Sequence, residues 1–427
     1  MQRVWFLIYD VVVVPLLWVA IRIAAGFKRK IRRGIRGRRH LWTKLQWQIN
    51  RLPSASNKRV WFHSSSMGEF EQAKPIIAEL KRRRPDVAVI VSFFSPSGYD
   101  HSRNYKLADV ITYLPFDWRE SARGFIDCTR PDAAVMVRYD VWPNHMRAAA
   151  NAGVPMLIAN ATMKRGSARY LPLVNSFHRT MYNGFKFILT VSEEDAAAFR
   201  RFGLTGPVVE AIGDTRYDQV NRRSVESKMR HILPPTLTAG RRVFVVGSSW
   251  DSDEEALIPV LTRLAADHPT LLTVLVPHEP TEEHLERIER ELNGKLSSLR
   301  FSDLHDYTAQ RVLIIDSVGI LMALYQYADV AYVGGSFGQG VHNVLEPAVY
   351  GAPVVVGPVH GNSQEAVQLI REGAAFAAHS EHELHEHLDR LLRDESFRID
   401  AGTKGRRFVE CHTGATERFL SYLEKVL

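Results

Sequence analysis

The sequence predicts an α/β protein built from two doubly wound, Rossmann-like domains. From residue 58 onward, short apolar runs rich in β-branched residues alternate with amphipathic stretches of helical length. This alternation stops over the polar residues 213–238 and then starts again. Alternating strands and helices are typical of a parallel sheet with helices on both faces. Because a chain of 427 residues usually forms two domains, we expect two such sheets that face a cleft.

The first half of the chain supplies the first sheet. Amphipathic residues 71–83 and 142–152 are two of the helices expected between its strands. The strands are expected, in order, at residues 60–63, 87–94, 110–114, 133–137, 155–159, 187–191 and 208–212.

The second half repeats this arrangement. Strands are expected at residues 243–246, 271–276, 312–315, 330–333 and 354–356, and helices at 252–266, 282–292, 319–327, 343–350 and 381–392. Ligands of such sheets bind beyond the carboxyl ends of the strands, so the loops that follow strands are candidate sites. The expected organisation is an N-terminal segment 1–40, two domains at 41–213 and 214–405, and a C-terminal helix at 406–427.

The net charge of +8 is local rather than a property of the whole chain. Residues 28–39 contain eight basic residues and no acidic ones, and the remaining chain holds basic and acidic residues in equal numbers. A nucleic-acid-binding protein needs a basic face on its folded part. We therefore expect no nucleic acid partner.

An apolar run, residues 4–27, precedes this basic block and is interrupted by Asp10, Pro15 and Arg22. A spanning helix needs about 20 predominantly apolar residues, and a signal peptide has its basic residues before the apolar part. We expect an N-terminal anchor, spanning or interfacial, whose basic flank binds anionic lipids and keeps the body in the cytoplasm. The alternative is a buried helix followed by a solvated run of charge.

The sequence offers little for a metal ion. The two cysteines, Cys128 and Cys411, form no pattern typical of disulfide frameworks or zinc sites. The triplet 251–253, Asp-Ser-Asp, resembles a metal-binding motif, but it begins a predicted helix. There, Ser and Asp cap the helix and acidic residues complement its dipole. We expect no metal.

Two loops that follow strands carry candidate functional groups. In the first, residues 63–70, Glu69 falls in the first turn of a helix, where it could act as a general base or could simply stabilise the helix start. In the second, residues 334–346, glycines precede a helix start and suit a phosphate. His342 and Asn343 add hydrogen-bond donors there, and Glu346 could accept both hydroxyls of a ribose.

Four motifs carry a family resemblance. Residues 64–77 read SSSMGEFEQAKPII, residues 137–144 read VRYDVWPN, and residues 213–220 read GDTRYDQV. Residues 314–358 read IIDSVGILMALYQYADVAYVGGSFGQGVHNVLEPAVYGAPVVVGP. In this order and spacing, the chain resembles the bacterial Kdo (3-deoxy-D-manno-octulosonic acid) transferases of lipopolysaccharide biosynthesis.

The resemblance implies a GT-B glycosyltransferase fold and an inverting transfer of Kdo from CMP-Kdo to a lipid A precursor similar to lipid IVA. It implies that the first domain binds the acceptor and the second binds the CMP-sugar, at the cytoplasmic face of the bacterial inner membrane. CMP-Kdo is the donor substrate, and no cofactor is expected. The leaving group carries one phosphate, which a helix start and Arg216 could stabilise without a metal.

By the same resemblance, Glu69 matches the catalytic base, while Asp140 and Arg216 match residues that stabilise the transition state or the leaving phosphate. The residues expected to bind the donor are Gly247, Ser248, Pro277, His278, Val318, Gly319, Ile320, Gly335, Ser336, His342, Asn343, Val344, Leu345 and Glu346.

Three positions depart from the family pattern. His278 stands in place of an arginine, and Ile320 and Arg138 each stand in place of a glutamate. We expect these changes to leave the reaction type unaltered. Which residues contact the donor and the acceptor stays open. Two alternatives remain at this stage: another GT-B transferase or epimerase that uses a UDP-sugar, and a catalytically inactive membrane scaffold.

Overall fold

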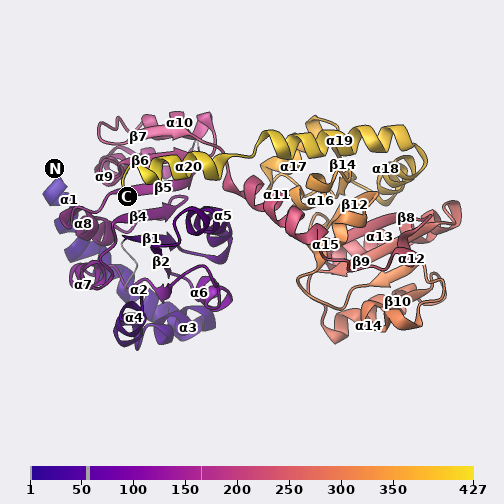
Figure 1. Cartoon of the computed structure of the whole chain (residues 1–427), viewed down its shortest axis with the longest axis horizontal. Coiled ribbons are helices and arrows are strands. Elements are labelled where there is room, and N and C mark those ends of the chain that lie inside the picture. The colour runs from indigo at the N-terminus through magenta and orange to yellow at the C-terminus, as the bar shows by residue number, and fades with distance from the viewer. Residues whose placement is uncertain (1, 54–57, 165) are drawn as a thin grey trace. The chain divides into compact units, whose positions relative to one another are not determined.

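A computed structural model of the chain describes residues 2–53, 58–164 and 166–427 (Figure 1). The chain forms two compact units. Unit 1 comprises Met1–Gln219 and Thr413–Leu427, and unit 2 comprises Val220–His412. Each unit contains a parallel sheet with helices between its strands, which confirms the predicted fold class.

Unit 1 holds a seven-stranded sheet, within the described residues, in the order β3-β2-β1-β4-β5-β6-β7. Its strands are β1 (Lys58–Ser64), β2 (Val87–Phe93), β3 (Val110–Tyr113), β4 (Ala133–Val137), β5 (Met156–Ala161), β6 (Phe187–Thr190) and β7 (Val208–Ala211). The helices that accompany them are α4 (Leu41–Ile49), α5 (Met67–Arg83), α6 (Pro96–Ser102), α7 (Arg119–Thr129), α8 (Pro143–Asn151), η2 (Ala168–Tyr170), α9 (Pro172–Tyr182), α10 (Glu193–Arg200) and α20 (Ala415–Glu424).

Unit 2 has a related topology that differs by the edge strand β10, with the order β10-β11-β9-β8-β12-β13-β14 among its described strands. These strands are β8 (Arg242–Ser249), β9 (Leu271–Pro277), β10 (Ser298–Arg300), β11 (Val312–Ile314), β12 (Val330–Val333), β13 (Val354–Val356) and β14 (Ala375–Ala377). Its helices are α12 (Pro235–Thr238), α13 (Asp251–Asp267), α14 (Glu282–Leu292), η3 (Phe301–Asp306), α15 (Leu321–Leu324), η4 (Tyr325–Tyr327), α16 (Leu345–Tyr350), α17 (Gln364–Arg371), α18 (Glu381–Arg393) and α19 (Glu395–Cys411).

Burial on both faces explains why the strands read as continuous apolar runs. Every residue of β2 is buried. Neighbouring strand residues point to opposite faces, so Trp61 and Ile90 belong to one core while Val60 and Val89 belong to the other. In both units the strand order changes direction beside the first strand, between β1 and β4 and between β8 and β12. Ligands of doubly wound sheets bind at such points, beyond the carboxyl ends of the strands.

The stretch expected as a polar linker, residues 213–238, is largely helical instead. It forms α11 (Thr215–Lys228) and α12. The buried residues of α11 are Thr215, Tyr217, Gln219, Val220, Ser224 and Ser227. Because four of these six residues are polar, the apolar periodicity that reveals a helix in a sequence is weak here. The two units divide inside this helix.

The prediction of a single helix over residues 406–427 is also wrong. Two helices, α19 and α20, meet at Gly414, whose φ of 97° lies in the left-handed region that favours glycine. Asp218 of unit 1 accepts hydrogen bonds from the N–H groups of Gly414 (2.6 Å) and Thr416 (2.7 Å). The chain therefore returns to unit 1, where Phe419 and Leu423 join the core.

The expected N-terminal apolar helix exists. Helix α1 (Gln2–Ile8), the π-helical segment η1 (Tyr9–Val13) and α2 (Val14–Phe27) follow one another directly. Val4–Phe27 is a helix long and apolar enough, by length and composition, to cross a membrane.

The basic block after this helix is not simply a solvated tail. Most of it forms α3 (Arg29–Gly37). Arg38 donates hydrogen bonds to the carbonyls of Phe94 and Leu114, each at 2.8 Å, and burial lowers its pKa to about 10. The predicted boundary at residue 40 thus assigns to the anchor a residue that holds unit 1 together.

Candidate functional site

Glu69 lies in the first turn of α5, directly beyond β1. Oxygen Oε2 of its carboxylate accepts hydrogen bonds from the backbone N–H groups of Ser65 (2.6 Å) and Ser66 (3.2 Å), and the Ser66 hydroxyl accepts from the Glu69 N–H (3.4 Å). This reciprocal capping box is the structural role considered for Glu69. However, burial and the negative charge of Asp140 raise the pKa of Glu69 to about 7, near the optimum for a general base at neutral pH.

Asp140 follows β4, so the structure brings it close enough to Glu69 for its charge to act there. Burial raises the pKa of Asp140, while the positive charges of Arg169 and Arg138 oppose that rise. Arg138 has a φ of 66°, and its N–H donates to the carbonyl of Ala159 at 2.8 Å. Non-glycine residues in the left-handed region are uncommon and concentrate at functional sites. Unit 1 therefore presents two carboxyl groups with raised pKa values, those of Glu69 and Asp140, together with two arginines whose positive charges oppose the rise.

Arg216 occupies the second position of α11, and its guanidinium pairs with Asp214 through Nε (2.8 Å) and a terminal nitrogen (2.7 Å). The neighbouring Thr215 is buried; its hydroxyl donates to the carbonyl of Gln72 at 2.6 Å and accepts from the Asn160 amide at 2.6 Å. Because Gln72 lies on α5, these bonds tie the start of α11 to the helix that carries Glu69.

Asn160 was not predicted from the sequence as a site residue. It is fully buried near the end of β5, with a φ of 51°. An asparagine that ends an apolar strand is a turn signal, because its side chain tolerates the left-handed region. That signal alone does not distinguish a turn from a site.

In unit 2 the three predicted loops meet at the carboxyl ends of adjacent strands β9, β8 and β12. The N–H of Gly334 donates to the Gly247 carbonyl at 2.9 Å. A Cβ at Gly247 would lie 1.9 Å from the hydroxyl oxygen of Tyr325, and one at Gly334 would lie 2.2 Å from the Ser248 carbonyl oxygen. These two glycines therefore allow the loops to pack against their neighbours, in addition to any role toward a ligand.

The buried carboxylate of Asp253 organises the glycine-rich loop. It accepts hydrogen bonds from the N–H groups of Gly335 (2.6 Å) and Phe337 (3.1 Å), and from the Tyr332 hydroxyl (2.7 Å). It also accepts from the Trp250 N–H at 3.0 Å, at the start of α13. The structural interpretation of the acidic triplet holds, and Asp253 already fills the anion position that the N–H of Gly335 was expected to offer a phosphate.

Ser336 is fully buried and bonded within the protein. Its hydroxyl donates to the Val333 carbonyl (3.0 Å) and accepts from the Gly357 N–H (2.7 Å). Donor binding by Ser336 stays a prediction. Because its hydroxyl is already bonded within the protein, other groups of this loop would have to contact the donor as well.

An aromatic cluster joins two predicted donor residues to Trp250, which the sequence did not single out as a ligand residue. His278 stacks on Trp250 at 4.4 Å and on His342 at 4.6 Å between ring centroids. The indole Nε1–H of Trp250 donates to Nε2 of His342 at 2.8 Å. Burial and neighbouring His278 lower the pKa of His342.

A cavity of about 580 Å³ adjoins this cluster. It is lined by Trp250, Asp251, Ser252, His278, Glu279, Thr281, Glu283, His284, Arg287, Arg290 and Gln339.

Glu346 is the second residue of α16, which begins two residues later than expected and has six residues. Glu346 therefore lies in the first helical turn rather than one turn inside. Its Oε1 accepts a hydrogen bond from the Asn343 side chain at 3.2 Å. Between them, Val344 and Leu345 are buried, so their side chains serve packing.

The remaining predicted donor residues lie in two further loops. Val318 is 79% exposed, Gly319 has a φ of 81°, and Ile320 precedes α15. Pro277 ends β9 and leads directly to His278.

One group of side chains in the described residues has metal-ligand geometry. Ligand atoms of Asp251, Glu254 and His284 lie within 4.8 Å of one another. Arg287 pairs with both carboxylates, at 2.9 Å from Asp251. Because a guanidinium already pairs with both carboxylates, we interpret this group as an ion-pair cluster.

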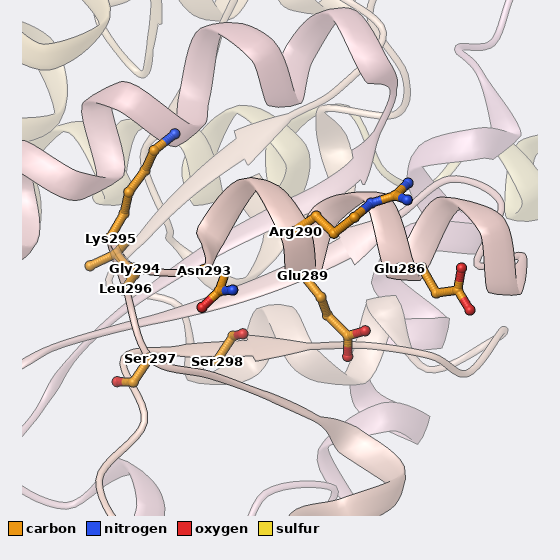
Figure 2. Close-up of a pocket in the computed structure, with 9 residues that line it drawn as sticks. All are labelled: Glu286, Glu289, Arg290, Asn293, Gly294, Lys295, Leu296, Ser297 and Ser298. Atoms are coloured by element: carbon orange, nitrogen blue, oxygen red, sulfur yellow. The ribbon is translucent and has the colours of Figure 1, made fainter.

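A second cavity, of about 690 Å³, lies at the end of α14 and in the residues that follow it (Figure 2). None of the predicted site residues lines it. Its lining consists of Glu286, Glu289, Arg290, Asn293, Gly294, Lys295, Leu296, Ser297 and Ser298.

Solved structures of low sequence identity share this fold. The UDP-GlcNAc 2-epimerase of Neisseria meningitidis, bound to UDP-GlcNAc, aligns with a TM-score of 0.60 and 12% identity over 86% of this chain and all of its own. The Methanocaldococcus jannaschii UDP-GlcNAc 2-epimerase aligns with a TM-score of 0.54 and 12% identity over 85% of this chain and 99% of its own. These likenesses agree with two Rossmann-like units of the GT-B type.

Sequence comparisons are more specific. Residues 38–219 match the family described as 3-deoxy-D-manno-octulosonic-acid transferase (kdotransferase). The 3-deoxy-D-manno-octulosonic acid transferase of Haemophilus influenzae is 25% identical over 86% of this chain and 87% of its own length. The enzyme of the same name from Aquifex aeolicus is 27% identical over 84% and 93%. Residues 38–219 thus belong to the 3-deoxy-D-manno-octulosonic-acid (Kdo) transferase family, and similarity to glycosyltransferases of that name extends over most of the chain.

Proposed function

We propose that this protein transfers Kdo from CMP-Kdo to a lipid A precursor similar to lipid IVA, with inversion at the anomeric carbon and with Glu69 as the general base. The observation that supports this role best is the buried carboxylate of Glu69, whose pKa of about 7 lies close to neutral pH. The similarity to Kdo transferases suggests the donor and acceptor classes, and the proposal extends them to this chain.

Glu69 has one oxygen held and one oxygen left for chemistry. The hydrogen bonds from Ser65 and Ser66 reach Oε2. In the proposed step, Oε1 accepts the proton of the acceptor hydroxyl while the hydroxyl oxygen bonds to the anomeric carbon of Kdo. The bond from that carbon to the CMP phosphate oxygen breaks, and CMP leaves with the electron pair.

The remaining predicted groups balance charge around this step. Arg216 and the cations beside Asp140 would stabilise negative charge that develops on the leaving phosphate. In unit 2, His342 and Glu346 would hold the CMP portion of the donor. We expect the reaction to need no metal.

We also propose that the protein works at the cytoplasmic face of the inner membrane. The apolar helix Val4–Phe27 and the basic residues after it support attachment to anionic lipids.

Mass spectrometry of the acceptor tests the reaction directly. The full chain is incubated with a lipid A precursor, Kdo, CTP and a CMP-Kdo synthetase. We expect the acceptor to gain the mass of one or more Kdo residues only when the chain is present. An unchanged acceptor, with protein that is folded and bound to CMP, would contradict the proposal.

A comparison of CMP with UDP separates this function from a UDP-sugar enzyme. A ligand that binds the folded state raises the unfolding temperature. CMP should therefore protect the protein, and UDP at the same concentration should not. Stronger protection by UDP would favour the alternative that the epimerase-like fold leaves open.

A further inference from the structure

We propose that the N-terminal helix, α1–η1–α2, lies in the plane of the membrane surface and does not cross the bilayer. One face docks on unit 1, and the opposite face enters the acyl chains of a single leaflet. This inference rests on the proposed membrane attachment and determines its geometry.

The start of the helix is docked on unit 1. The indole Nε1–H of Trp5 donates to the Ser176 hydroxyl on α9 at 3.1 Å. The hydroxyl of Tyr9 donates to Asp117 at 2.8 Å in a buried position. Asp10, the acidic residue that interrupts the apolar run in the sequence, therefore directly follows a residue that is bonded to the body.

Asp10 itself is paired with α8. Its Oδ1 accepts a hydrogen bond from the Asn144 side chain at 2.8 Å, and its Oδ2 pairs with Arg147 at 2.9 Å. Asp117 also accepts from the backbone N–H groups of Asn144 and His145, each at 3.0 Å. These bonds give Trp5, Tyr9 and Asp10 partners in the body of unit 1, so that none of these three side chains has to enter lipid. Arg22 is exposed and lies over the ring of Trp18 on the same helix.

The chain immediately after the helix is docked on the same unit. Helix α3 begins two residues after Phe27, and Arg33 pairs with Asp100 of α6 at 2.9 Å. Gly34 is buried against Pro96, where a Cβ would lie 3.2 Å from the proline ring. Figure 1 shows α1 near α8 and α9, and α2 near α3 and α4, all in unit 1.

Docking of both ends on one body excludes a span. A helix of 24 residues is about 36 Å long at about 1.5 Å per residue, and a helix that crosses the roughly 30 Å hydrocarbon core places its ends on opposite sides. Here, Tyr9 and Asp10 near the start and Arg33 beyond the end all contact unit 1.

The undocked face has the composition of a membrane-facing surface. Phe6, Tyr9 and Val14 are buried, whereas most of the other large apolar side chains of this helix are exposed. The exposed set is Val4, Leu7, Ile8, Val11, Val12, Val13, Leu16, Leu17, Trp18, Val19, Ile23 and Phe27. Beside this face, α3 and its flanks expose basic residues, which suit anionic headgroups. Exposed apolar side chains suit acyl chains, and the basic residues that follow them suit anionic headgroups.

Spin-label depth measurements test the orientation in the full chain. Single cysteines replace Leu7, Leu16 or Ile23 in a Cys128→Ser, Cys411→Ser background, and the labelled proteins bind vesicles of phosphatidylethanolamine and phosphatidylglycerol. An in-plane helix places all three labels at a similar shallow depth, about 5–10 Å. Cys411, kept as the sole cysteine in a parallel sample, is exposed and supplies the solvent control.

A spanning helix would give a different pattern. Leu16 would lie about 13 Å deeper than Leu7, because a helix rises about 1.5 Å per residue. Such a gradient in protein that sediments with the vesicles would overturn the in-plane orientation alone. Absence of sedimentation would contradict both the membrane attachment and the orientation.

Topology in cell membranes provides a second, independent test. An epitope is added before residue 1, and inverted membrane vesicles are treated with protease from outside. An in-plane helix leaves the epitope on the side of the body, where it is digested. A protected epitope beside a digested body would overturn the proposal.

Discussion

Glu69 has features that suit two roles which sequence reasoning treats as alternatives. Its carboxylate closes a capping box through Oε2, which is what a purely structural glutamate would do. The same bonds fix the side chain while burial and Asp140 raise its pKa to about 7. A capped glutamate can therefore also serve as a pre-positioned base, since its geometry is set before the substrate arrives.

The pH dependence of turnover should report this carboxyl group. The base must be ionised, so kcat/KM should rise with pH up to about 7 and then level off. The charge of Asp140 disfavours the ionised form of Glu69, and Asp140→Asn removes that charge. The acid limb of the profile should then move to lower pH. An unmoved limb, or one moved to higher pH, would show that Asp140 does not act on the base.

Glu346 should contribute to nucleotide binding although its helix is short. Glu346→Ala should weaken CMP binding by about 1–3 kcal/mol, the usual cost of leaving partners of a charged hydrogen bond unpaired. Isothermal titration of CMP measures this loss. Glu381→Ala, at the start of α18, is the control and should leave CMP affinity unchanged. Unchanged affinity in a folded Glu346→Ala variant would remove this residue from the site.

Trp250 should fix the tautomer of His342. An indole N–H can only donate, so its bond at 2.8 Å requires an unprotonated Nε2 and places the proton of neutral His342 on Nδ1. Nitrogen-15 NMR should show this tautomer, and Trp250→Phe should abolish the preference. His63, whose Nε2 accepts from Trp142 at 3.0 Å, is an internal control that should not change. Protonated Nε2 in the unaltered protein would contradict the interpretation.

For individual helices, tertiary packing determines where a helix forms and begins, which the apolar periodicity of the sequence does not always reveal. The stretch that forms α11 was expected to be a linker because it is polar, and the residues that it buries include polar ones such as Ser224 and Ser227. Helix α16 was expected to begin at Asn343, but Asn343 uses its side-chain oxygen to accept from the Leu345 N–H at 3.2 Å. Asparagine competes with the backbone in this way and so favours positions before a helix over positions inside it.

Docking of the N-terminal helix should be measurable as stability. Tyr9→Phe removes the hydroxyl that donates to buried Asp117. The free energy of unfolding should fall by about 1–2 kcal/mol, which corresponds to about 2–4 °C per kcal/mol for a domain of this size. Thermal unfolding of the full chain in detergent measures the shift.

Tyr422→Phe is the matched control for this change. Its hydroxyl also bonds a carboxylate, that of Glu210, but at the surface. Its loss should cost less than about 0.5 kcal/mol, as is usual for surface substitutions. Equal shifts for the two variants would contradict a docked helix.

For the whole molecule, the repeated strand pattern was sufficient to predict the fold. All twelve expected strands occur, because strands buried on both faces keep long apolar runs. The strands that were missed, β10 and β14, have three residues each and include few buried side chains. The C-terminal return to unit 1 was also missed, since only a contact distant in sequence, from Asp218 to Gly414, reveals it.

The candidate site was predictable in part. Position along the chain identified the loops around Glu69, Ser248 and His342, because each follows a strand of a parallel sheet. The sequence could not reveal that Asp253 accepts a hydrogen bond from the N–H of Gly335, since the two residues are far apart in the chain. Nor could it show that Trp250 contacts His342, for the same reason.

The central claim is that the carboxylate of Glu69 removes the proton from the acceptor hydroxyl. The most direct test measures turnover, CMP binding and thermal stability on one preparation of full-length Glu69→Gln. Glutamine keeps an oxygen for the N–H groups of Ser65 and Ser66 but cannot act as the base. Glu383→Gln is the control, because Glu383 also lies three residues after a capping serine, Ser380.

We expect Glu69→Gln to lower Kdo turnover by roughly 10²–10⁴-fold, the usual contribution of general acid–base catalysis, while CMP affinity and unfolding temperature stay close to those of the unaltered protein. Glu383→Gln should leave all three unchanged. Near-normal turnover in folded Glu69→Gln, or a loss of turnover matched by losses of stability and CMP binding, would contradict the account.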